Sequence, residues 1–303
     1  MTNINICLSC DDNYAKHAGV AIASILVNAS KNDELNFYIL NSGISTPNKE
    51  KISLLSSIKK CNINFIEVNK NLFKAYRAIK THSYISIPAY YRLKLASLLP
   101  EVKRIIYFDC DIVVNTSLKS LFESDLKGNP LGAVRDINRK MLKKNPSYIN
   151  SGMLVMDLDT IREKQIEELL LQWTINNADS ITMGDQEIIN RACIGQITLL
   201  DDGWNVQSSN FINRSSYTKN PKVVHYIAKN KPWHWASFSY HRELYFRYLQ
   251  LTPWRLDKKE YKHWTIDNQR ASLIKYLLRR PTFFLRPRFY EALVKTYLIQ
   301  GDI

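Results

Sequence analysis

Short apolar runs alternate with segments of helical periodicity through the first 108 residues of the chain. The apolar runs at 4–9, 35–40, 63–68 and 104–108 predict strands, and the segments at 14–29, 46–60 and 87–99 predict helices. Because parallel strands need a crossover that a helix usually supplies, this alternation predicts an α/β fold with a mostly parallel, Rossmann-like sheet flanked by helices. Further strands are predicted at 131–134 and 152–158, and an amphipathic helix at 161–177. Ligands of such sheets bind beyond the carboxyl ends of the strands.

The end of the chain differs in composition from the rest. From Trp254 onward, 11 basic residues stand against 5 acidic ones, with aromatic residues between them. We therefore predict a main α/β domain over residues 1–253 and a small, basic, helical extension over residues 254–303. The whole chain carries a formal net charge of +14, which predicts an anionic partner: nucleic acid, an acidic membrane surface or a phosphorylated substrate. A basic, solvated surface without such a partner is the alternative.

The chain shows no sign of export or of membrane insertion. No stretch reaches the ~18 apolar residues of a membrane span, and the first residues lack the pattern of a secretory signal. Five cysteines without a zinc-ligand pattern predict reduced thiols in a reducing compartment. These features predict a cytoplasmic protein.

Acidic residues follow two of the predicted strands. Asp11 and Asn13 come after the first strand, and Asp109 and Asp111 come after the fourth, on the same side of its pleat. Two carboxylates at a strand end can bind a hard divalent cation together with substrate phosphates, although a pair that caps the next turn is the alternative. Because no glycine-rich phosphate loop is present, any phosphate must be held by a metal or by side chains.

Three later segments could complete such a site. His225 follows a β-branched run, and imidazole suits Mn²⁺; Lys231 lies six residues farther on, close enough to neutralise a diphosphate. Asp185 and Gln186 open a predicted helix, and Asn150 and Ser151 precede a buried strand. Each segment also has a purely structural interpretation: a buried histidine, a helix cap and a turn.

Six ordered motifs give the chain a family resemblance. "CDDNYA", "PAYYRLKL", "IIYFDCDIVV", "YINSGMLVMDL", "GDQEIIN" and "HYIAKNKPWH" occur in the order and spacing of glycosyltransferase family 8. The resemblance covers roughly residues 3–253. Within the family, the chain is similar to the bacterial lipopolysaccharide and lipooligosaccharide α-galactosyl- and α-glucosyltransferases. It implies a GT-A-type fold, and the basic aromatic tail resembles the extension of the lipopolysaccharide-core members.

The resemblance also implies roles for individual residues. Asp11, Asn13 and Tyr14 would bind the uracil and ribose, and Lys231 the diphosphate. Asp109, Asp111 and His225 would bind Mn²⁺, with Mg²⁺ as the alternative, and Asp109 also belongs to the nucleotide-sugar site. The wall around the donor sugar would consist of Arg92, Asp136, Asn150, Ser151 and Asp185. Gln186 would face the anomeric carbon, so Gln186 and Asp185 are the candidate catalytic residues. One position departs from the family pattern HxxGxxKPW, since Ala228 stands where the family has glycine.

The implied function is a Mn²⁺-dependent, retaining transfer of galactose or glucose from UDP-galactose or UDP-glucose to a lipopolysaccharide-core saccharide. We expect departure and attack on the same face of the sugar, with Gln186 steadying positive charge. The basic tail would hold the protein on anionic lipids at the cytoplasmic face of the bacterial inner membrane. No nucleic acid is expected as a partner.

Two other functions compete with this interpretation. A nucleotidyltransferase would also use a metal and a nucleotide, but the HYxxxxKPW segment argues against it. A nucleic-acid-binding protein would explain the net charge. It would leave the two aspartates, His225 and the Asp185–Gln186 pair unexplained.

Overall fold

The computed structural model describes residues 2–77, 79, 87–208, 221–228, 231–237, 239, 241–279, 281–285, 287 and 290. Within the predicted extension, positions 280, 286, 288, 289 and 291–303 lie outside the described residues, as do residues 229 and 230 of the "HYIAKNKPWH" motif.

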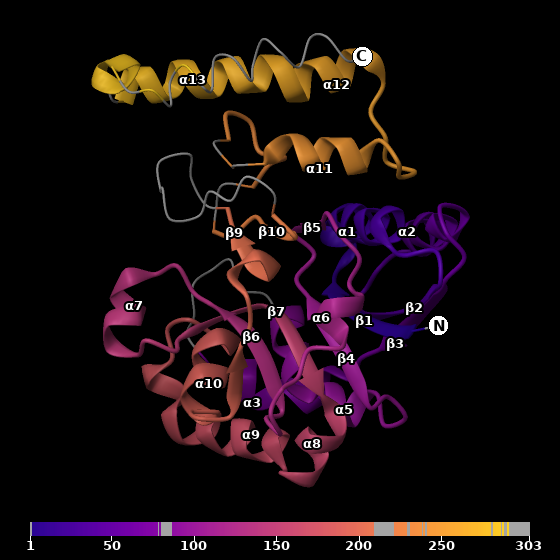
Figure 1. The fold of residues 1–303 in the computed structure, drawn as a ribbon, viewed down its shortest axis with the longest axis vertical. Helices are drawn as coiled ribbons and strands as arrows, with labels where there is room; N and C mark the ends of the chain where they lie inside the picture. Colours follow the sequence, from indigo (N-terminus) through magenta and orange to yellow (C-terminus); the bar gives the residue numbers. More distant parts are fainter. Residues whose placement is uncertain are drawn as a thin grey trace.

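A mixed, mainly parallel sheet of seven strands forms the centre of the molecule, in the order β3-β2-β1-β4-β7-β6-β8 (Figure 1). Its strands are β1 Thr2–Cys10, β2 Asp33–Asn41, β3 Asn62–Glu67, β4 Arg104–Phe108, β6 Leu131–Arg135, β7 Ile149–Asp157 and β8 Ile197–Leu199. Only β7 runs antiparallel to its neighbours, β4 and β6. The predicted mostly parallel α/β sheet is confirmed.

A second sheet of three short strands stands at one end of the first, in the order β5-β10-β9. Its strands are β5 Ile112–Val114, β9 Val206–Gln207 and β10 Val223–His225. Since β4 belongs to the large sheet and β5 to the small one, residues 109–111 form the passage between the two sheets.

Helices cover both faces of the large sheet. The helices of the described residues, including those that lie beyond α1, are α1 Ala15–Asn28, α2 Thr46–Ser53, α3 Lys74–Arg77, α4 Ile87–Tyr90, α5 Leu95–Leu98, α6 Lys119–Phe122, α7 Arg139–Lys144, α8 Leu158–Glu163, α9 Ile166–Asn177, α10 Asp185–Ala192, α11 Arg242–Leu249, α12 Lys258–Lys262 and α13 Asn268–Arg279. Shorter turns of 3₁₀ helix are η1 Asp12–Tyr14, η2 Leu54–Ser57, η3 Lys70–Phe73, η4 Tyr91–Lys94, η5 Ala178–Ser180, η6 Asp202–Asn205 and η9 Pro281–Leu285, and η8 His263–Asp267 is a π-helical turn.

Alternation along β1 divides the core into two layers. Ile4, Ile6 and Leu8 join the apolar cluster under α1 and α2, whereas Cys7 joins the cluster under α5, α8, α9 and α10. Cys110, between the two aspartates, is buried in the first cluster, as expected for a packing residue.

Three predicted helices are interrupted. The segment 46–60 forms α2 as far as Ser53 and then η2. The segment 87–99 forms α4, η4 and α5 in succession, and the segment 161–177 breaks between α8 and α9 at Gln165, whose φ is 51°. The predicted position of Asn150 and Ser151 before a strand is wrong, because both lie inside β7.

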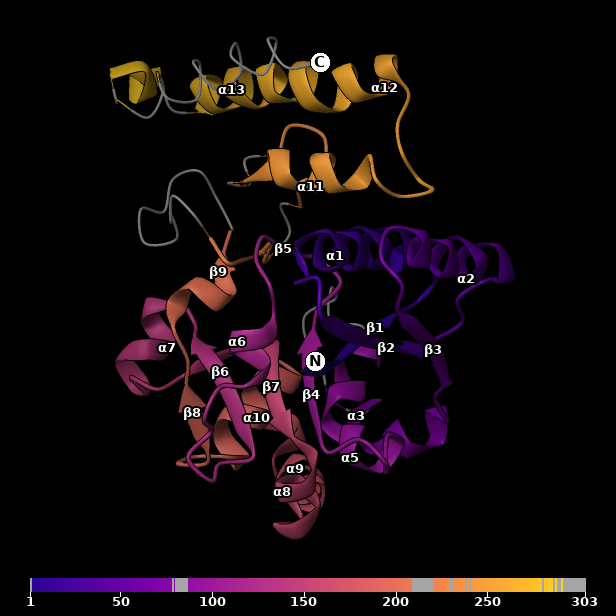
Figure 2. The same cartoon turned by 45° about the vertical axis from the view of Figure 1, so that its right-hand side comes forward.

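The described part of the C-terminal extension is mainly helical, as predicted, and packs on the body through α11. In both views α11 lies between α1 and the layer of α12 and α13 (Figures 1 and 2). A third apolar cluster joins α1, β5, β10 and α11, and Trp254, Tyr261 and Trp264 of the extension pack against it.

Hydrogen bonds also tie the extension to the segment after Lys231. Asn268, fully buried at the start of α13, accepts a hydrogen bond from the backbone N–H of Ala236 and donates to the carbonyl of His234 at 3.1 Å. Ser272 donates to the carbonyl of Ser237 at 2.9 Å. The division of the chain at residues 253 and 254 stays a prediction, and these bonds cross it.

Candidate active site

A cavity of about 1230 Å³ opens at the carboxyl ends of β1 and β4, where the small sheet meets the large one. Twelve of the predicted site residues line it: Asp11, Tyr14, Arg92, Asp109, Asp111, Asp136, Asn150, Ser151, Asp185, Gln186, His225 and Lys231. The remaining one, Asn13, is exposed on η1 beside the cavity and does not contribute to its lining.

Asp109, Asp111 and His225 converge at the passage between the two sheets. One ligand atom of each lies within 4.8 Å of the others. β10 pairs antiparallel with β5, with His225 opposite Ile112, and this register places the imidazole beside Asp111. His225 Nε2 lies 3.2 Å from Asp111 Oδ1 and 3.7 Å from Asp109 Oδ2.

These three side chains fit a divalent cation. Asp111 Oδ1 is buried and accepts no hydrogen bond from any part of the chain that the structure describes. A Cβ on Gly152 would meet His225 Cε1 at 2.1 Å and Asp109 Oδ2 at 2.7 Å, so only glycine leaves room for this arrangement. Two carboxylates and one imidazole form a donor set that suits Mn²⁺.

Lys231 adds a positive charge at the same place. Its ammonium donates to Asp111 Oδ2 and to the carbonyl of Tyr226 at 2.6 Å. Burial alone would raise the pKa of Asp111, but the neighbouring ammonium of Lys231, with the His225 ring beside it, outweighs burial and holds that pKa well below its usual range. Asp111 is therefore ionised at neutral pH.

Arg92 connects the two acidic ends of the cavity. It lies on η4, only 3% exposed, and donates to Asp109 Oδ1 at 2.6 Å and to the carbonyl of Ser151 at 2.5 Å. Its Nε lies 3.1 Å from Asp185 Oδ2, which also accepts from Ser151 Oγ at 2.9 Å. Burial raises the pKa of Asp185, and the nearby guanidinium of Arg92 opposes this rise.

A network of carboxamides occupies the other end of the cavity. Gln186 Nε2 donates to Asp136 Oδ2 at 3.0 Å, and Gln186 Oε1 accepts from Asn150 Nδ2 at 3.1 Å and from the backbone N–H of Ser151 at 3.3 Å. Asn150 in turn connects to Asn205, whose Nδ2 lies 3.0 Å from Asn150 Oδ1.

The first strand ends at a capped turn. Asp11 caps η1 by accepting a hydrogen bond from the backbone N–H of Tyr14 at 3.1 Å. The Tyr14 ring is 39% exposed and stands edge-on to Trp233, with 6.2 Å between the ring centroids. This turn contributes Asp11 and Tyr14 to the lining of the cavity.

Two further functional candidates, Gly152 and Asn205, could not be predicted from the sequence. Gly152 lies within a quoted motif, but the contact that requires glycine comes from β10, 73 residues later in the chain. Asn205 precedes a strand of two residues in "DDGWNVQ", and no local pattern distinguishes it.

The structure also explains the departure at Ala228. Its φ is 63°, in the left-handed region that glycine adopts without steric cost. The family's glycine thus corresponds to a backbone requirement, and this chain meets the requirement with a strained alanine.

The family model described as glycosyl transferase family 8 matches residues 5–236. A putative glycosyltransferase of Haemophilus influenzae is 31% identical over 76% of this chain and 73% of its own length. A lipopolysaccharide 1,2-glucosyltransferase of Escherichia coli K12 is 24% identical over 89% of this chain and 87% of its own. Some relatives are longer, and the chain spans 61% and 51% of two of them.

The fold agrees with that of a solved transferase. The crystal structure of the galactosyltransferase LgtC, in complex with donor and acceptor sugar analogs, superposes with a TM-score of 0.73 at 25% identity, over 86% of this chain and all of that one. The expected GT-A-type fold is confirmed. No described helix is both long and apolar enough to cross a bilayer.

Proposed function

Because this chain belongs to glycosyl transferase family 8, we propose that it is a retaining, Mn²⁺-dependent transferase that moves galactose or glucose from a UDP-hexose to a lipopolysaccharide-core saccharide. The convergence of Asp109, Asp111 and His225 beside Lys231, inside one cavity, carries the proposal. Mg²⁺ is the alternative cation.

The residues around Asp111 suit the departure of a diphosphate. Breaking the bond between sugar and UDP places negative charge on the leaving group, and a bound cation would stabilise that charge. Lys231 and His225 both contact the carboxylate of Asp111. The Lys231 ammonium is therefore positioned to stabilise the negative charge that develops on the diphosphate. Asp11 and Tyr14, which also line the cavity, are our candidates for binding the uridine.

The carboxamide network suits the other half of the reaction. Gln186 Oε1 already accepts two hydrogen bonds, so it is a poor nucleophile, and its amide dipole can instead steady positive charge on the sugar. The neighbouring carboxylate of Asp185 is held by Arg92 and Ser151. We therefore favour departure and attack on the same face. A trapped sugar adduct on Asp185 or Gln186 would contradict this.

A panel of UDP-sugars tests the activity. With Mn²⁺ and no acceptor, slow release of free UDP from UDP-galactose or UDP-glucose is expected, without pyrophosphate. Asp111→Asn should abolish it, whereas Asp159→Asn, at a half-exposed residue of α8 outside the cavity lining, should not. Release of pyrophosphate would indicate a nucleotidyltransferase, and full activity of Asp111→Asn would exclude the metal assignment.

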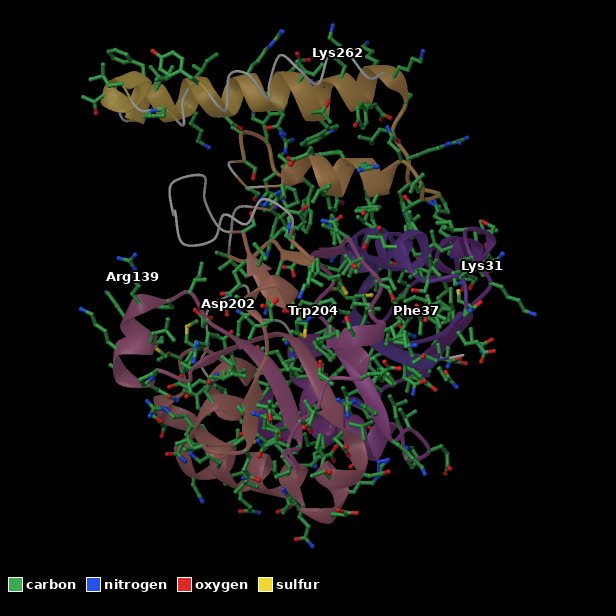
Figure 3. All side chains as sticks on the ribbon, in the orientation of Figure 1. Lys31, Phe37, Arg139, Asp202, Trp204 and Lys262 are labelled. Carbon is green, nitrogen blue, oxygen red and sulfur yellow. The ribbon has the colours of Figure 1, made fainter. Side chains whose placement is uncertain are left out.

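The acceptor proposal has support from one relative and from the surface charge. The Escherichia coli relative is a lipopolysaccharide glucosyltransferase by name. Arg139 and Lys140 of α7 line the cavity beside Asp136, and Lys143 and Lys144 continue the basic surface outward. Figure 3 shows Arg139 on the outer side of α7, directed away from the body. A phosphorylated saccharide would match this charge.

The extension supports the proposal of a peripheral protein at the cytoplasmic face of the inner membrane. Lys258, Lys259 and Lys262 are exposed on α12, and Lys262 projects away from α11 (Figure 3). Ile274 and Leu278 of α13 are 59% and 79% exposed. Each basic residue near an anionic surface contributes about 1 kcal/mol.

Sedimentation with vesicles tests this attachment. Changing Lys258, Lys259 and Lys262 together to glutamate should release the protein from vesicles that contain phosphatidylglycerol, while UDP release continues. Charge reversal is preferable to deletion of residues 254–303, because deletion also removes Asn268 and Ser272. Undiminished sedimentation of the charge-reversed protein would contradict a membrane role for α12.

A further inference from the structure

Asn205 lies between the proposed metal site and the carboxamide network, and it is only 2% exposed. It closes η6, and its side chain spans the space between Asn150 of β7 and His225 of β10. It does not belong to the lining of the cavity, so its contribution to a reaction can only pass through these neighbours.

The orientation of the Asn150 carboxamide is fixed by groups that have one possible role. The backbone N–H of Gly152, which can only donate, lies 3.1 Å from Asn150 Oδ1. The carboxylate of Asp136, which can only accept when ionised, lies 3.3 Å from Asn150 Nδ2. Both assignments agree, so Asn150 presents its oxygen toward Asn205.

The orientation of Asn205 follows from that of Asn150. Only the NH₂ group of Asn205 can face Asn150 Oδ1, at 3.0 Å, so the Asn205 oxygen faces the other way. There it lies 3.1 Å from His225 Nδ1. A carboxamide oxygen accepts and cannot donate, and Nδ1 must therefore carry the proton.

We propose that Asn205 is a positioning residue that holds His225 in the Nδ1–H tautomer and so leaves the Nε2 lone pair facing Asp109 and Asp111. This inference rests on the metal site of the proposed function. A metal-binding histidine needs an unprotonated ring nitrogen toward the ion, and a partner on the other nitrogen fixes ring and tautomer.

The backbone that carries Asn205 is held in place on both sides. Asp201 caps η6 by accepting from the backbone N–H of Gly203 at 3.1 Å, and the backbone N–H of Lys222 donates to the Gly203 carbonyl at 3.1 Å. Trp204 is buried, and the ammonium of Lys222 lies 4.8 Å from the centre of its ring. Figure 3 shows Trp204 in the interior of the molecule. The carboxamide therefore starts from a fixed point.

Two substitutions of Asn205 distinguish its effect on the His225 tautomer from its contribution to packing. Asn205→Leu keeps the approximate volume and removes the acceptor, whereas Asn205→Asp keeps an acceptor for Nδ1. Asn129→Leu is a matched control, since it removes a carboxamide that donates to Thr198, remote from the cavity. Circular dichroism and thermal melts establish that each variant is folded.

The first measurement is the affinity of the full chain for Mn²⁺, determined from the electron paramagnetic resonance signal of the free ion. Loss of an outer partner of a metal ligand typically weakens affinity about 10–100-fold, and we expect that loss for Asn205→Leu. Asn205→Asp should stay within a few-fold of the unaltered protein, as should Asn129→Leu. Unchanged affinity in Asn205→Leu would overturn the proposal.

Nitrogen-15 spectra of histidine-labelled protein at pH 8, without metal, give the second measurement. The His225 signals, assigned with His225→Gln, should show the proton on Nδ1, and Asn205→Leu should shift the proton toward Nε2. Nδ1–H in both proteins would overturn the role of Asn205. Because neither measurement uses a sugar donor, a failed transferase assay would leave this result intact, and absent Mn²⁺ binding in every protein would contradict the metal site.

Discussion

The ammonium of Lys231 donates a hydrogen bond to the carboxylate of Asp111, although 120 residues separate them in the chain. Both side chains are about one-eighth exposed, so water solvates neither charge well. Removing one member of a pair this poorly hydrated leaves the other without its main partner. The pair thus links the passage between the two sheets to the segment after β10.

Replacing Lys231 tests this link. In Lys231→Met the leaving group loses a positioned cation, and kcat/KM for a UDP-hexose should fall about 10²–10³-fold. Lys231→Arg should recover part of the loss. Steady-state release of UDP measures both, with Lys164→Met on the far surface as the control, since Lys164 bonds only the Gly128 carbonyl among the described residues. Equal kinetics for Lys231→Met and the unaltered protein would contradict the role.

Substitution of Gly152 should damage the metal site by crowding. The Cβ of Gly152→Ala would press on His225 and on Asp109 Oδ2, and Mn²⁺ affinity should fall at least about 10-fold, as expected when metal ligands lose their orientation. Gly132→Ala in the neighbouring strand is the control, because its Cβ would meet the Leu126 side chain at 2.5 Å, outside the cavity. Isothermal titration with Mn²⁺ compares the two. Equal losses in both variants would attribute the effect to sheet distortion.

The strained Ala228 predicts a stabilising substitution. Left-handed backbone costs an L-residue about 1–2 kcal/mol, and glycine costs about 0.5–1 kcal/mol in chain entropy. Ala228→Gly should therefore raise the free energy of unfolding by about 0.5–1 kcal/mol. Ala178→Gly, at a residue with helical dihedrals, should lower it by a similar amount. Urea unfolding measures both, and a destabilised Ala228→Gly would show that the φ of 63° is not strained.

The sequence predicted the layers of this fold better than its interruptions. Hydrophobic periodicity revealed the strands of the large sheet that come before residue 109, because each alternates with a helix. Periodicity could not reveal the interruption of the predicted helix 87–99. There η4 carries Arg92, whose partner Asp109 lies outside the segment. The strands β9 and β10 hold two and three residues, too few for any period.

The candidate site divides in the same way. Asp109 and Asp111 could be recognised from local spacing, and His225 and Lys231 from a motif. Asn205 acts only through partners 55 and 20 residues away, so no stretch of sequence contains its role. Residues that act by orienting other residues can be identified only in the three-dimensional structure.

Stability should depend on pH through His17. Its Nδ1 lies 2.7 Å from the Tyr245 hydroxyl and its ring stacks on Trp233, with 3.6 Å between centroids. Burial, reinforced by Lys16, lowers the pKa of His17 from 6.5 to about 3. Between these two values the unfolded chain binds a proton that the folded chain does not. The free energy of unfolding should therefore fall by up to about 1.4 kcal/mol per unit as the pH is lowered through this window.

His17→Gln removes this dependence and gives the comparison. The difference in unfolding free energy between the unaltered protein and His17→Gln should shrink, or change sign, from pH 7 to pH 4. Urea titrations at several pH values measure it. A difference that stays constant across this range would contradict the assigned pKa.

Asn268 and Ser272 give the C-terminal extension a structural role in addition to the proposed membrane attachment. Ile274 and Leu278 of α13 are exposed, whereas Asn268 and Ser272 are buried and hold the backbone that follows Lys231. Substitutions on the two faces should separate in their effects: those outside alter where the enzyme resides, and those inside alter how fast it turns over. A relative that acquired a different anchor would still have to supply an equivalent support for the Lys231 segment.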